Sequence, residues 1–129
     1  MNDKPDHRTN KKDKSKMQDW DGLRGALTAR VGEFAELNPD VMRGIKIIEN
    51  SPEQTGKLDA KVRSLIALAV AVTTRCDGCI SVHSKRAVDA GASREEIAEA
   101  LGVAIWLNAG AAVTYTARVF DAVDGLSAA

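Results

Sequence analysis

The run from Leu65 to Val72 constrains the fold most, because burial of eight consecutive apolar residues is strongly favourable. Taken alone, such a run fits either a buried strand or a helix. Alanine is abundant in it, β-branched residues are few, and the apolar pattern continues back to Leu58 past charged Lys61 and Arg63. This favours a helix from Asp59 to about Thr74, apolar on all sides and therefore central in a bundle.

Apolar residues at steps of three and four predict further helices on both sides of this central one. Asn38 and Pro39 are suited to start a helix, and Ser93 with Glu96 forms a capping box. Residues 51–56 are rich in turn formers, and Asn108 to Gly110 indicate a break. Besides the central helix, we expect helices over 20–37, 39–50, 76–91, 93–107 and 111–123.

Composition supports an all-α fold of about six helices in one domain, residues 17–129. Apolar residues make up 44% of the chain but aromatic residues only 4%, so the core must consist of Ala, Val, Leu and Ile. Small side chains let helices pack closely but bury little area each, so association into an oligomer would add stability. Residues 1–16 are polar and carry six basic groups against three acidic ones, which predicts a disordered basic tail.

The charge balance argues against nucleic acid as the main partner, since 18 basic residues match 18 acidic ones. The N-terminus contains no apolar segment of the kind found in signal peptides. The stretch from Ile97 to Ala117 is weakly apolar and contains Glu99 and Asn108, so we interpret it as two core helices rather than a membrane span. We therefore expect a soluble, cytoplasmic protein.

The motif Cys76-Asp77-Gly78-Cys79, followed by His83, contains both cysteines of the chain. On a helix, steps of three and four residues place Cys76, Cys79 and His83 on one face. A helix N-terminus, the imidazole and the basic side chains nearby would each favour a thiolate. A thiolate that attacks a peroxide becomes a sulfenic acid, which a second thiol converts to a disulfide. His83 favours Cys79 as the attacking residue and Cys76 as the resolving one; the helix dipole and exposure favour the reverse.

A strand before the two cysteines would indicate a thioredoxin-like fold, but the helical pattern points elsewhere. Two segments, Arg75–Ile80 with His83 and Ala90–Leu101, resemble the AhpD-like branch of the carboxymuconolactone decarboxylase superfamily. The resemblance covers residues 40 to 125. It implies an all-α fold, obligate trimers or hexamers, and an alkylhydroperoxidase or disulfide reductase re-reduced by lipoyl-type or other dithiols. It also implies catalytic roles for Cys76, Cys79 and His83. We expect no cofactor and no metal.

Two positions depart from that family's peroxidase pattern. Ser64 stands where the pattern has a proton-relaying Glu, twelve residues before the first cysteine, and Gly78 stands where a second His is common. Serine cannot act as a base at neutral pH. The proton relay must then end at His83, be weak, or use another acid such as Glu49 or Glu53.

Alternative functions remain at this point. A lyase of the decarboxylase branch would leave the two cysteines unexplained. A non-enzymatic oligomeric or metal-binding module would need four zinc ligands, and Cys76, Cys79 and His83 would require His7, Asp77 or a neighbouring subunit to complete them. Covalent haem attachment needs a His directly after the second Cys, where Ile80 stands. We expect Trp106 and Tyr115 in the core or at a subunit interface.

Overall fold

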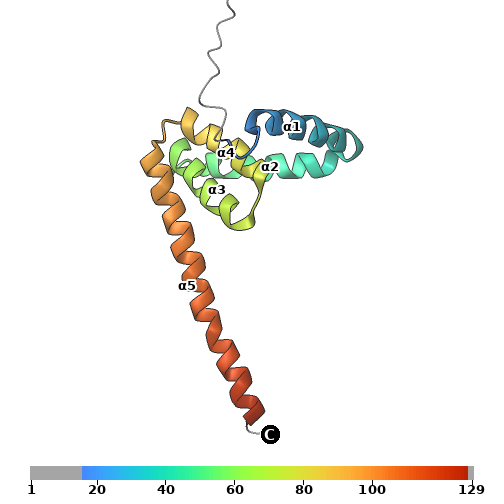
Figure 1. Ribbon diagram of the computed structural model, residues 1–129. Helices are drawn as coiled ribbons and strands as arrows, with labels where there is room; N and C mark the ends of the chain where they lie inside the picture. Colours follow the sequence, from blue (N-terminus) through green and yellow to red (C-terminus); the bar gives the residue numbers. More distant parts are fainter. Residues whose placement is uncertain (1–15, 128–129) are drawn as a thin grey trace, which may run out of the picture.

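The computed structural model describes residues 16–127, which form five α-helices and no strand (Figure 1). The helices are α1 (Trp20–Leu37), α2 (Pro39–Thr55), α3 (Ala60–Thr74), α4 (Asp77–Asp89) and α5 (Arg94–Ser127). The all-α prediction is confirmed for these residues. The predicted tail lies outside the described residues except for Lys16, and so does His7.

Capping residues begin these helices where the sequence predicts. The carboxylate of Asp59 accepts a hydrogen bond from the Val62 backbone N–H at 2.8 Å, which starts α3. At the start of α5, Ser93 Oγ accepts from the Glu96 N–H at 3.0 Å, and Glu96 Oε2 accepts from the Ser93 N–H at 2.8 Å. Both caps satisfy backbone donors that have no partner inside the helix. Pro39 is the first residue of α2, as expected.

The prediction of two helices after Ser93 is wrong, because α5 runs unbroken for 34 residues. Asn108 does not interrupt it: the side-chain Nδ2 donates to the Ala104 carbonyl at 2.7 Å, one turn back. Gly110 costs about 1 kcal/mol relative to alanine in a helix but does not force a break. Alanines surround both positions and have the highest helix propensity of any residue.

The second helix is also longer than predicted, because residues 51–55 continue α2 instead of forming a turn. Pro52 lies inside the helix, in its last turn, where it removes one backbone hydrogen bond and its ring crowds the carbonyl four residues before it. The helix ends at Gly56, which has a φ of 65° and donates its N–H to the Pro52 carbonyl at 3.2 Å. A left-handed glycine is therefore the stop signal, four residues after the proline.

Helix α3 is the packing centre, as its apolar run predicts, and it lies against both α4 and α5. The buried apolar side chains are Leu68 and Ala71 of α3, Ala87 of α4 and Ala104 of α5. Helix α3 is not covered on every side, since Ile66 and Val70 remain about half exposed. The buried apolar core of the single chain is therefore small and rich in alanine.

Helix α5 extends far beyond the other four helices, and only its first part packs on α3 (Figure 1). Trp106 is 71% exposed and Tyr115 is 67% exposed, so the expectation of a core position within one chain is wrong. Among the described residues, α5 is also the one helix long and apolar enough to cross a membrane by length and composition. Exposed apolar surface of this extent is typical of a site that contacts protein or lipid.

An ion pair between α3 and α5 gives the fold a testable pH dependence. Lys61 Nζ lies 2.7 Å from Glu96 Oε1, and the hydrogen bond between them lowers the pKa of Glu96 below 4.5 and raises the pKa of Lys61 above 10.5. A lowered carboxyl pKa stabilises the fold above pH 4.5, and that stability is lost as the pH falls through the lowered value. The Lys61 contribution is complete below pH 10.5 and is lost above it.

We expect Glu96→Gln to unfold at a lower urea concentration than the wild type at pH 7, because it breaks this pair. The difference should shrink as the pH is lowered below 4.5. Glu99→Gln on the same helix serves as the control and should change little. A gap between Glu96→Gln and wild type that stays constant from pH 7 to the acid limit would contradict this account.

Candidate functional site

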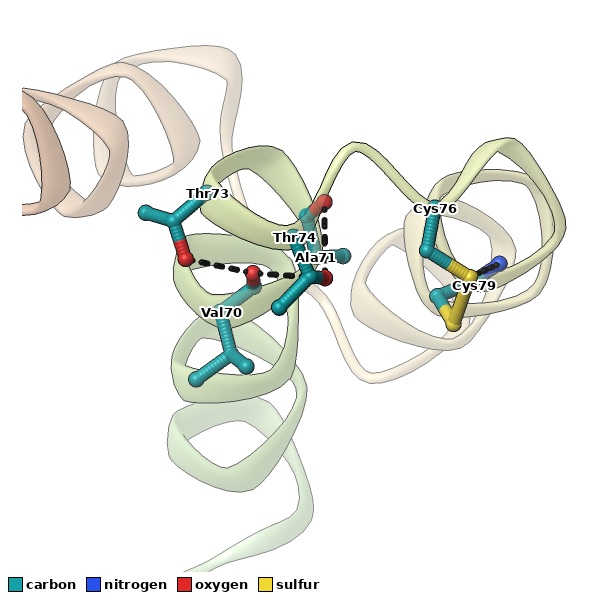
Figure 2. Close-up of a disulfide and its surroundings, with 6 residues drawn as sticks. All are labelled: Val70, Ala71, Thr73, Thr74, Cys76 and Cys79. Carbon is teal, nitrogen blue, oxygen red and sulfur yellow. Dashed lines mark hydrogen bonds between the residues drawn. A yellow bond between two sulfur atoms is a disulfide. The ribbon is translucent and has the colours of Figure 1, made fainter.

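The turn between α3 and α4 places the two cysteines. Arg75 has a left-handed backbone with a φ of 54°, and the Cys76 N–H donates to the Ala71 carbonyl at 3.1 Å. The hydroxyls of Thr73 and Thr74 donate to the carbonyl oxygen of Val70, at 2.8 and 3.1 Å, in the last turns of α3 (Figure 2). The chain therefore reverses within two residues, and α4 starts beside the end of α3.

Cys76 and Cys79 are joined by a disulfide, with their Cα atoms 5.2 Å apart (Figure 2). Cys76 is the N-cap of α4, and its sulfur accepts a hydrogen bond from the Cys79 backbone N–H at 3.1 Å. Both residues are partly exposed. In the reduced protein, the same N–H and the helix dipole would stabilise a negative charge on Cys76.

His83 lies one helical turn after Cys79 and borders an open pocket of about 890 Å³ between α2, α3 and α4. Partial burial lowers the pKa of His83 from its ordinary value of 6.5, and the charge of Arg86 lowers it further, while Glu49 opposes both. His83 is therefore neutral at pH 7, the state in which an imidazole can accept a proton. The two cysteines are not among the residues that line this pocket.

The pocket beside His83 brings together residues that the sequence places far apart. Glu49 of α2 accepts a hydrogen bond from Arg86 Nη2 at 2.7 Å, and both border the pocket together with Ser64 of α3. Ser64 is buried, with 7% of its surface exposed, so this position offers a hydroxyl where the family pattern has a carboxylate. The two candidate acids, Glu49 and Glu53, both border the pocket. Only Glu49 raises the pKa of His83.

Helix α1 holds α4 through contacts that sequence reasoning did not find. Ser81 lies between Cys79 and His83 in the sequence and is almost fully buried. Its hydroxyl donates a hydrogen bond to the Trp20 carbonyl at 3.1 Å. Arg24 Nη1 donates to the carbonyl and the hydroxyl of Ser81, at 3.0 and 3.2 Å. Nothing in the local sequence signals these contacts, because sixty residues of chain separate the partners.

Gly78, between the cysteines, lies against α1. A Cβ built at Gly78 would lie 3.0 Å from Leu27 Cδ1, closer than side chains normally pack. The sequence identified Gly78 as a departure from the family pattern but offered no reason for it. The structure shows that a side chain at this position would crowd the end of the Leu27 side chain on α1.

No group of three or more His, Cys, Asp or Glu side chains is arranged to hold a metal ion within residues 16–127. The sulfurs of Cys76 and Cys79 are bonded to each other, and His83 follows Cys79 by one turn of α4. A disulfide sulfur is not a thiolate, which is the form that binds zinc.

Comparison with known proteins identifies the segment that carries this site. The model of the carboxymuconolactone decarboxylase family matches residues 39–122, which include α2, α3 and α4. An uncharacterised protein of Haemophilus influenzae is 46% identical over 104 residues, covering 81% of this chain and 92% of its own. "Uncharacterized protein 4 in cox locus" of Paracoccus denitrificans is 35% identical over 101 residues, covering 76% and 91%.

Two solved structures share the fold. The first is the apo form of a carboxymuconolactone decarboxylase family protein from Legionella pneumophila, which has a TM-score of 0.65 and 34% identity and covers 76% of this chain and 88% of its own. The second, a protein from Methanobacterium thermoautotrophicum, has a TM-score of 0.63 and 34% identity and covers 69% and 97%. Helix α1 precedes the segment that the family model matches, so its contacts with α4 are an addition to that segment.

The contact between Gly78 and Leu27 predicts an energetic coupling. Gly78→Ala should be more favourable in a Leu27→Ala background than in the wild type, by about 0.5 to 1 kcal/mol, because the truncation removes the close contact. Urea unfolding of the four proteins of this cycle measures the coupling. Gly102→Ala, whose added Cβ would meet nothing within 4 Å, is the control and should behave alike in both backgrounds. Additive effects of Gly78→Ala and Leu27→Ala would refute the contact.

Proposed function

Because the chain belongs to the carboxymuconolactone decarboxylase family, we propose that it is a thiol-dependent oxidoreductase of the AhpD-like kind. It reduces hydroperoxides, or exchanges dithiols with disulfides, through Cys76 and Cys79. The observation that supports this most is the bonded pair of sulfurs at the N-terminus of α4, with His83 one turn beyond. A lyase in this family would have no use for that pair.

The proposed reaction starts from the reduced protein. His83 takes the proton of the Cys79 thiol, and the thiolate attacks one oxygen of the hydroperoxide. A sulfur–oxygen bond forms, the oxygen–oxygen bond breaks, and the alkoxide leaves as an alcohol with the proton from His83. The Cys76 thiol then attacks the sulfenic sulfur, a disulfide forms, and water leaves. One hydroperoxide has consumed two thiols.

An external dithiol closes the cycle by thiol–disulfide exchange. The partial exposure of Cys76 and Cys79 supports this step, since a lipoyl-type or similar dithiol must reach one of the two sulfurs directly. Attack on Cys76 is favoured when Cys79 is the peroxide-reactive residue. A reducing compartment such as the cytoplasm, which we propose as the location, would supply such dithiols.

Single variants separate the proposed roles. We expect Cys79→Ser to abolish hydroperoxide consumption. Cys76→Ser should retain one fast turnover and then stop at a sulfenic acid on Cys79, because the resolving thiol is absent. His83→Asn should slow the reaction by about 10²- to 10⁴-fold, the usual contribution of a positioned acid–base group. Stopped-flow measurement with cumene hydroperoxide, together with a dimedone trap for the sulfenic acid, checks all three.

The opposite result in the two cysteine variants would exchange the attacking and resolving roles of Cys76 and Cys79. A dimedone adduct on Cys76 in the Cys79→Ser variant would make Cys76 the attacking residue, consistent with its place at the helix N-terminus. Hydroperoxide consumption that survives in the Cys76→Ser/Cys79→Ser double variant would refute the thiol mechanism as a whole. Decarboxylation of a muconolactone by that double variant would favour the lyase alternative.

We also propose that the protein works as a homo-oligomer, a trimer or hexamer, assembled in part through α5. Ten large side chains along this helix are at least half exposed or nearly so in the single chain: Val103, Ile105, Trp106, Leu107, Val113, Tyr115, Val119, Phe120, Val123 and Leu126. Contiguous apolar surface of this extent favours association. The charged residues of this helix are better suited to a protein interface than to a bilayer. They include the glutamates of its first turn and, near its end, Arg118, Asp121 and Asp124.

Sedimentation equilibrium of the full chain without detergent tests this assembly. We expect a trimer or hexamer at micromolar concentration, and Phe120→Glu should shift it toward smaller species by placing a charge in the apolar surface. Ala29→Glu on exposed α1 is the control. A monodisperse monomer would contradict the proposal, and a protein that requires detergent to stay in solution would favour a membrane role for α5.

A further inference from the structure

The pocket beside His83 holds a carboxylate that the proposed reaction has not yet used. Glu49 comes from α2, whereas His83 and Arg86 come from α4, three residues apart and hence on one face of that helix. Arg86 Nη2 lies 2.7 Å from Glu49 Oε1, and both residues border the pocket that His83 also lines. Glu49 and Arg86 are each about half exposed, which leaves room for both side chains to adjust.

Among the acidic side chains around His83, Glu49 is the one that acts on the imidazole. On α2 and α3, Glu53 pairs with Arg63 at 3.5 Å, and Arg63 also donates to the Leu58 carbonyl. On α4, Asp89 pairs with Lys85 at 2.6 Å, and on α1, Arg24 pairs with Asp21 and also donates to Ser81. Arg75 and Asp77, on either side of Cys76, do not act on the pKa of His83. Arg86 and Glu49 are the two charged side chains that act on the imidazole, with opposite signs.

We propose that Glu49 is a positioning residue for the thiol chemistry, acting through His83. The inference rests on the proposed function, in which the sulfur–hydrogen bond of Cys79 breaks, its electron pair stays on sulfur, and the proton moves to the imidazole. The imidazolium so formed lies in a half-buried site beside the guanidinium of Arg86. Glu49 offsets the charge of Arg86 and stabilises the imidazolium, much as a carboxylate does behind a catalytic histidine. Ser64, buried in the same pocket, carries no charge that could do this.

Two variants with opposite expected effects test the proposal. Glu49→Gln removes the group that raises the pKa of His83 and leaves Arg86 unpaired. The acid limb of the pH–rate profile for thiol oxidation by cumene hydroperoxide should move to lower pH, and the plateau rate should fall about tenfold as the imidazole becomes a weaker base. Arg86→Gln removes a group that lowers the pKa, so the acid limb should move to higher pH. Glu53→Gln, on the same helix and in the same pocket, is the control and should leave the limb unmoved.

A second measurement does not depend on peroxidase activity. Proton NMR titration of the His83 ring in the oxidised protein, assigned with His83→Asn, should show a lower pKa in Glu49→Gln and a higher one in Arg86→Gln. If the wild type is inert toward hydroperoxide, the proposed peroxidase function fails. The same variants are then compared in reduction of the Cys76–Cys79 disulfide by dithiothreitol, where a leaving thiolate needs a proton.

The results that would overturn the proposal are specific. If Glu49→Gln oxidises at the wild-type rate and its His83 titrates as in the wild type, the carboxylate has no role. A slower rate with an unmoved His83 titration would show that Glu49 supports only the fold. Shifts of the same sign in Glu49→Gln and Arg86→Gln would refute the electrostatic argument.

Discussion

The reversal of the chain between α3 and α4 is the constraint on which the site depends. The left-handed Arg75 and the hydrogen bond from the Cys76 N–H to the Ala71 carbonyl place the start of α4 beside the end of α3. Cys76 thereby becomes the cap of α4, Cys79 lies in its first turn, and His83 borders the pocket one turn later. This turn of two residues thus places the pair of sulfurs at a helix N-terminus, and His83 follows on the same helix. Helix α1 then holds α4 through Ser81, which lies between Cys79 and His83 in the sequence.

Most of the local structure could be predicted from the sequence, because its signals are local. Asp59, Ser93 with Glu96, and Gly91 act within one turn of themselves, so the starts of α3 and α5 and the end of α4 follow from residue type alone. The predicted break at Asn108 was wrong, because its signal depends on the surrounding residues. Whether a helix continues through Asn and Gly depends on the residues around them, and here the Asn108 amide bonds back to its own helix.

The site was predictable in part for the same reason. Cys76 and Cys79 are three residues apart, so their helical spacing was enough to predict that their sulfurs can meet. Glu49 was a candidate from its charge, but its selection over Glu53 required the ion pair with Arg86, thirty-seven residues away. The contacts of Arg24 and Leu27 with α4 had no sequence signal, because they depend on how α1 packs. The long exposed face of α5 likewise became visible only when the two predicted helices proved to be one.

The central claim is that Cys76 and Cys79 act as one redox unit on a hydroperoxide, and intact-mass spectrometry tests it most directly. The fully reduced protein is mixed with one equivalent of cumene hydroperoxide, and the product is digested without reductant. The account predicts a loss of two hydrogen atoms per chain and a peptide that contains an internal Cys76–Cys79 disulfide. Unchanged mass, or stable addition of oxygen to a single cysteine with the other still free, would contradict it.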